Sequence, residues 1–149
     1  MRPLRKLVVV GATIALLAVL VPSASAASPR SGDLHVTKEC SQYAGAAGGF
    51  CTIMSSNLPA IKVGTKVIYI QALTTSVLDT DIVLDTPDQG NNMAFGHVNL
   101  DLQTGLGQVT FSGGTGRFSG FTASVVVTAN ADRSVWYWEG TYSFSPPAH

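Results

Sequence analysis

Residues 112–119 read Ser-Gly-Gly-Thr-Gly-Arg-Phe-Ser, and a run of residues typical of β-strands lies on each side of them. Clustered glycines are used where the backbone takes positive φ or turns without room for a Cβ. The phosphate-loop pattern Gly-x-x-x-x-Gly-Lys is missing. The glycines miss the spacing of a dinucleotide-binding loop by one residue, and they lead into a strand rather than a helix. We therefore predict a structural turn between two strands, with the Arg117 side chain on the surface.

Short strand-like runs continue through the chain after its first 26 residues. In them β-branched and aromatic residues alternate with Gly, Asn, Asp and Pro, and helical periodicity is absent. The expected strands cover residues 32–38, 50–57, 65–74, 81–85, 93–102, 107–112, 118–129 and 134–144. Residues 86–92 form a strong turn sequence, and a last hairpin is expected at 129–132, where Asn and Asp tolerate left-handed φ. Eight strands with short connections predict an all-β fold, either a closed antiparallel barrel or a sandwich.

Alternation along the strands assigns their side chains to two faces. His97 and Asn99 share one face, for example, and Val98 and Leu100 share the other. Several strands carry apolar residues on both faces, as expected for a barrel that has a lined cavity and an outer face packed against another molecule. This pattern favours a homo-oligomer.

The first 26 residues have the composition of a secretory signal peptide. A basic segment with Arg2, Arg5 and Lys6 precedes an apolar run over residues 7–21, and Ala24-Ser25-Ala26 is a small-x-small cleavage pattern. The run is short for a membrane span, which needs roughly 20 residues, and an uncleaved anchor is the alternative interpretation. We predict a cleaved signal peptide at 1–26, a single domain at 27–149 and a secreted, extracellular protein.

Removal of this segment would change the charge balance. The full chain has nine basic and nine acidic residues, and three of the basic ones lie in the signal segment. The remaining excess of acid argues against a nucleic-acid partner and against an anionic membrane, since both need clustered Lys and Arg.

The two cysteines, Cys40 and Cys51, both follow the signal segment. In an exported protein a pair at this spacing predicts a disulfide. A free reactive thiol at Cys51 is the alternative. A zinc site is disfavoured because no second pair of Cys or His lies at ligand spacing, and the acids Asp79 and Asp81 break the calcium-loop pattern, so we expect no metal.

Four stretches together resemble one family, the allene oxide cyclase-like barrels. They are Gly-Gly-Phe-Cys-Thr-Ile at 48–53, Phe-Gly-His-Val-Asn-Leu at 95–100, the glycine turn at 109–120, which is similar to that of dirigent proteins, and Val-Trp-Tyr-Trp-Glu-Gly at 135–140. The resemblance implies an eight-stranded antiparallel closed barrel with an apolar central cavity, often dimeric or trimeric. Members include plant allene oxide cyclases and bacterial cyclases, which act mainly by holding a reactive substrate in a productive shape.

Three functions remain open at this point. The resemblance implies a secreted barrel that binds a small apolar molecule in its cavity and promotes cyclisation or isomerisation, without a cofactor. A non-catalytic, dirigent-like or ligand-binding barrel is the alternative. A secreted structural or inhibitory protein is a third hypothesis, which rests only on small size and the cysteine pair.

Seven residues are candidates for the site. We expect ligand contacts from Tyr69, Gln71, His97, Asn99, Trp136 and Trp138, and acid–base chemistry from His97, Glu139 or Tyr69. Each candidate has a structural alternative: a solvated outer face for His97 and Asn99, a core position for Tyr69, a core or interface position for the tryptophans, and an exposed strand position for Glu139.

Overall fold

The computed structural model describes residues 20, 22 and 30–146. The predicted signal peptide at 1–26 and the predicted start of the mature chain near Ala27 lie, apart from Leu20 and Pro22, outside the described residues. Within the described ranges, no helix is long and apolar enough to cross a membrane.

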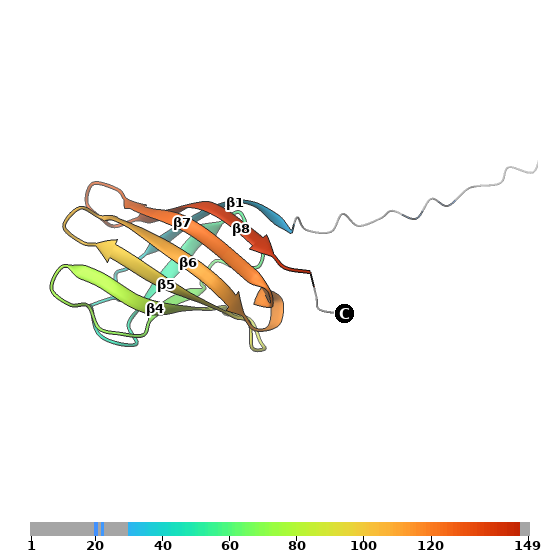
Figure 1. Ribbon diagram of the computed structural model, residues 1–149, viewed down its shortest axis with the longest axis horizontal. Coiled ribbons are helices and arrows are strands. Elements are labelled where there is room, and N and C mark those ends of the chain that lie inside the picture. Colours follow the sequence, from blue (N-terminus) through green and yellow to red (C-terminus); the bar gives the residue numbers. More distant parts are fainter. Residues whose placement is uncertain (1–19, 21, 23–29, 147–149) are drawn as a thin grey trace, which may run out of the picture.

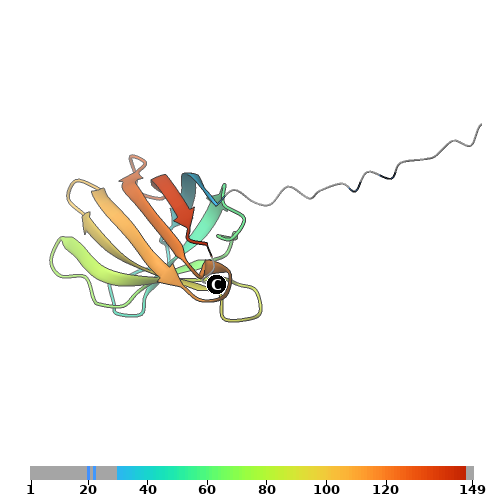
Figure 2. The same cartoon turned by 45° about the vertical axis from the view of Figure 1, so that its right-hand side comes forward.

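Eight strands form one closed antiparallel barrel in which each strand pairs with its neighbours in the sequence (Figures 1 and 2). The strands are β1 (Ser31–Glu39), β2 (Phe50–Ser56), β3 (Lys66–Tyr69), β4 (Val77–Asp85), β5 (Met93–Asp101), β6 (Leu106–Gly114), β7 (Phe121–Ala129) and β8 (Trp136–Phe144). The barrel closes where β1 pairs with β8, with Val36 opposite Trp138 and Lys38 opposite Trp136. The all-β closed barrel predicted from the sequence is thus confirmed, and the sandwich alternative is excluded.

The strand expected at 81–85 begins earlier, at Val77, and the strand expected at 118–129 begins only at Phe121, after a 3-10 turn. Two further differences from the predicted segments involve side-chain hydrogen bonds. The strand expected at 65–74 is shorter because the Thr80 hydroxyl accepts from the Gln71 N–H at 2.8 Å and so takes the place of a backbone partner. In the last hairpin Arg133, not Asn or Asp, takes positive φ (56°). Asn130 and Asp132 instead accept backbone N–H groups with their side chains, from Val135 and Ser134 respectively, both at 3.0 Å.

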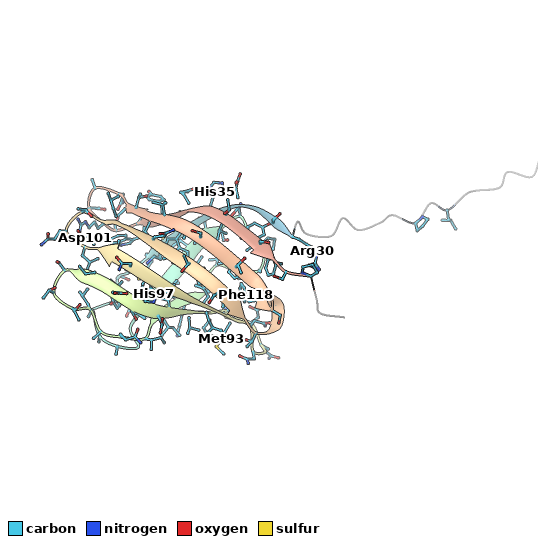
Figure 3. The ribbon with its side chains drawn as sticks, viewed as in Figure 1. Arg30, His35, Met93, His97, Asp101 and Phe118 are labelled. Carbon is cyan, nitrogen blue, oxygen red and sulfur yellow. A yellow bond between two sulfur atoms is a disulfide. The ribbon has the colours of Figure 1, made fainter. Side chains whose placement is uncertain are left out.

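The glycine turn closes one end of the barrel, on the right in Figure 1. A Cβ at Gly114 would collide with the Met93 carbonyl oxygen, and Gly116 has φ of 56° at the start of a 3-10 turn, η1 (Gly116–Phe118). This turn folds Phe118 inward, where it is 0% exposed and packs edge-to-face on Phe121 at 5.4 Å between ring centroids. We call this the glycine-turn end; Phe118 is labelled there in Figure 3.

The opposite end, on the left in Figure 1, carries the loops that connect β1 to β2, β3 to β4, β5 to β6 and β7 to β8. A disulfide between Cys40 and Cys51 joins the end of β1 to the start of β2, as predicted, so Cys51 is not a free thiol. We call this the disulfide end. Its first loop, residues 41–49, is rich in glycine and alanine and folds over the mouth of the barrel.

Candidate functional site

A partly open cavity of about 200 Å³ lies inside the disulfide end. For comparison, an apolar cavity of about 150 Å³ is large enough to bind benzene. Most of its lining is apolar and comes from strands on both sides of the barrel and from the loops: Leu73, Leu78, Leu100, Leu102 and Trp136. The cavity therefore has the size and lining of a site for a small molecule.

Lys38 is the one lysine in this lining, which contains no arginine, aspartate or glutamate. It follows Leu34 and Val36 on the inward side of β1, because alternate residues of a strand share a face, and it is only 3% exposed. Within the part of the chain that the structure describes, no ion pair involves Lys38. A buried amine without an anionic partner is costly, so its neutral form is favoured.

The Lys38 amine is held by hydrogen bonds rather than by a charge. Its Nζ donates to the Tyr69 hydroxyl at 2.6 Å and, more weakly, to Cys40 Sγ at 3.8 Å. The Tyr69 hydroxyl donates in turn to Cys51 Sγ at 3.2 Å. The amine, the phenol and the disulfide thus form one short polar chain at the edge of an apolar cavity.

Burial controls the protonation of both groups. Loss of water lowers the pKa of Lys38 to about 7. The rings of Tyr69, Trp136 and Trp138 lie 5.3 to 5.8 Å from Nζ and attract its protonated form. Burial, and to a lesser degree Tyr43, raises the pKa of the Tyr69 phenol, which therefore keeps its proton. Near neutral pH the site contains a protonated phenol beside an amine that exchanges between its two forms.

The loop over the cavity is fixed to β3 by backbone hydrogen bonds. The Gly48 N–H donates to the Tyr69 carbonyl at 2.7 Å, and the Tyr69 N–H donates to the Gly49 carbonyl at 2.9 Å. Tyr43 packs on the Tyr69 ring at 4.5 Å between centroids, and its own buried hydroxyl has no hydrogen-bond partner among the described residues.

The structure brings only part of the predicted site together. Tyr69 and Trp136 line the cavity, and Trp138 is buried beneath the lysine. Gln71 is exposed and accepts from the Thr80 hydroxyl at 2.6 Å, so it belongs to the loop after β3.

The other predicted residues lie on the outer face of the barrel. Asn99 is exposed, and Glu139 is paired with His35 outside the barrel. His97, labelled in Figure 3, lies between Asp81 (Nδ1, 2.9 Å) and Asp79 (Nε2, 2.6 Å) on the outside of β4 and β5. These two carboxylates, Asp81 foremost, raise the pKa of His97. From this outer face the predicted residues Asn99, Glu139 and His97 have no access to the cavity.

Lys38 was not among the residues predicted from the sequence. The signal that could have found it is its position two residues after Val36, in the inward phase of the first strand. A neutral amine at this place can act as a nucleophile or as a base, and the Tyr69 phenol can donate or relay a proton.

In the described ranges no three His, Cys, Asp or Glu residues are grouped so that they could hold a metal ion. In comparisons with known proteins, no protein-family model, no curated protein and no solved structure matches the chain. The geometry of the cavity is therefore the basis for a function.

Proposed function

We propose that this protein is a secreted ligand-binding barrel, and that the cavity at the disulfide end holds a small, mainly apolar molecule with one polar group. The observation that carries the proposal is Lys38, a buried amine that has no anionic partner among the described residues and lies in a cavity lined mostly by apolar side chains. Pockets for small molecules combine an apolar lining with a few placed polar groups. The Cys40–Cys51 disulfide is compatible with the extracellular location.

A second candidate is promotion of cyclisation or isomerisation of the bound molecule, as the family resemblance implies. One observation favours it: the Tyr69 hydroxyl and the Lys38 amine lie 2.6 Å apart at the cavity wall. A proton donor and a proton acceptor in contact with one substrate can move a proton within it. Non-catalytic binding needs only the cavity and is the better supported of the two.

Binding can be followed through the two tryptophans of the chain, since Trp136 lines the cavity and Trp138 lies next to Lys38. We expect benzyl alcohol and benzaldehyde to change their fluorescence in a saturable way. Leu100→Phe, which fills the cavity, is expected to weaken binding about tenfold, or about 1.4 kcal/mol. The neighbouring Asn99→Ala and His97→Asn, on the outer face, serve as matched controls and are expected to leave the affinity unchanged.

Native mass spectrometry of the protein from its own culture medium completes the test. A copurifying small molecule that is lost from the Leu100→Phe variant would support the proposal. Equal affinity of the Leu100→Phe and Asn99→Ala variants for both probes, or no saturable binding of either, would contradict it.

A further inference from the structure

Lys38 differs from the other lysines of the described chain in its surroundings. Lys62 is exposed and paired with Asp88 at 2.9 Å, and Lys66 is exposed beside the Phe50 ring at 4.7 Å. Among the described lysines only Lys38 is buried and lines a cavity, and none of the ion pairs between described residues involves it. Of the three lysines that the structure describes, one therefore lies in a setting that favours reactivity and two lie in ordinary settings.

The hydrogen bonds of Lys38 suit a nucleophile. A neutral amine has two N–H groups and one lone pair. The Tyr69 hydroxyl and Cys40 Sγ accept from Nζ at 2.6 and 3.8 Å, which accounts for both N–H groups and leaves the lone pair unused. Lysines become nucleophilic towards carbonyl carbons when an apolar site holds them in this neutral form.

We propose that Lys38 binds ligands that carry an aldehyde or ketone group, by forming a reversible imine with them inside the cavity. This inference rests on the proposed ligand-binding function and names the ligand class of the same cavity. An apolar carbonyl compound fits both the Leu-rich lining and the amine at its edge.

The reaction balances without any further reactant. The Nζ lone pair forms a bond to the carbonyl carbon, and the C=O π electrons move to the oxygen. The Tyr69 hydroxyl gives its proton to this oxygen and takes one from the nitrogen, so it remains a neutral phenol. A second proton transfer from nitrogen to oxygen accompanies loss of water and formation of the C=N bond. One carbonyl and one amine thus give one imine and one water, and the reverse steps release the ligand.

Reductive trapping tests the inference on the intact, disulfide-bonded protein. Benzaldehyde and sodium cyanoborohydride at pH 7 convert an imine into a stable benzyl amine, and peptide mapping by mass spectrometry locates it. Exposed lysines are almost fully protonated at this pH. We expect Lys38 to be labelled at least about tenfold faster than Lys62 or Lys66 and several-fold faster than the N-terminus. The rate is expected to rise between pH 6 and 8, and urea is expected to abolish this selectivity.

Two variants separate nucleophile from cavity. Lys38→Met keeps an apolar side chain of similar length and is expected to bind benzaldehyde, seen by tryptophan fluorescence, without being labelled at residue 38. Tyr69→Phe removes the proton relay and is expected to slow labelling about tenfold while Lys38 stays in place.

The outcomes distinguish this inference from the binding proposal. Saturable benzaldehyde binding with labels spread equally over Lys62, Lys66 and the N-terminus would overturn the imine and leave the binding function standing. Absence of saturable binding together with absence of selective labelling would overturn both.

Discussion

The two ends of the barrel use the same alternating strands but are filled in different ways. At the glycine-turn end, inward positions carry aromatic rings, and Phe121 lies within 5.1 to 5.6 Å of Phe111, Phe118 and Phe144 between ring centroids. At the disulfide end, the inward positions carry leucines and a lysine, and a cavity of about 200 Å³ remains.

The difference lies in what covers each end. A 3-10 turn inserts Phe118 into the barrel at one end, whereas a loop of small residues lies over the other and contributes Ala44 and Gly45 to the cavity wall. The glycine-turn end supplies packing energy, because close-packed interiors lose stability with each missing atom. The disulfide end gives up some of that packing energy and holds the buried Lys38 amine beside a cavity, and for this reason we place the function there.

Substitution of Phe118 tests the packing of the glycine-turn end and has the largest expected effect on stability. Phe118→Ala removes a fully buried ring from the aromatic cluster and is expected to lower the free energy of unfolding by about 3–5 kcal/mol, measured by urea denaturation. Leu73→Ala changes a half-buried side chain in the cavity wall and is the control at the disulfide end. It is expected to lower the free energy of unfolding clearly less. Equal losses would remove the contrast between the two ends.

The pH dependence of stability tests the buried amine. Above about 10.4, the ordinary lysine pKa, both folded and unfolded states have a neutral amine. Between that pH and about 7 only the unfolded state binds the proton, so stability falls as pH decreases through this window, by about 5 kcal/mol at most. Below 7 both states are protonated and the dependence ends.

Lys38→Met is expected to remove this dependence and to be more stable than the unmodified protein at pH 7. Urea denaturation of the two proteins between pH 7 and 9.5 isolates the effect, because tyrosines titrate above this range. Parallel pH profiles would contradict a buried, neutral Lys38.

Removal of the disulfide tests the loop at residues 41–49, which lies over the cavity at the disulfide end. Cys40→Ala with Cys51→Ala frees a loop across a sequence separation of 11 and is expected to cost about 3 kcal/mol. Faster amide hydrogen exchange is expected at Gly48 and Tyr69, whose N–H groups hold the loop to β3, with no change in the glycine turn. Equally accelerated exchange at both ends would mean that the disulfide supports the whole barrel rather than this loop.

Much of the barrel follows from period-two alternation and glycine placement, which act locally. These signals predicted the strands and put His97 and Asn99 opposite Val98 and Leu100. They did not indicate which face is inside, because the exposed Phe95 makes the outer face of β5 look apolar as well.

The site was less predictable because it depends on contacts between distant strands. A charged residue in a strand is usually exposed, and only closure of β1 onto β8 places Lys38 opposite Trp136. The strand predicted from the sequence wrongly extended through Gln71. The Thr80 side chain that binds the Gln71 N–H lies nine residues further along the chain, so the local pattern does not indicate it.

The most direct test of the account is the titration of Lys38 itself. NMR spectroscopy of protein with isotope-labelled lysine, assigned with the Lys38→Met variant, reports the protonation of each amine. We expect Lys38 to titrate with a pKa of about 7, far below the ordinary lysine pKa of about 10.4. Titration of Lys38 at the ordinary lysine pKa of about 10.4 would contradict the buried neutral amine on which the proposed chemistry depends.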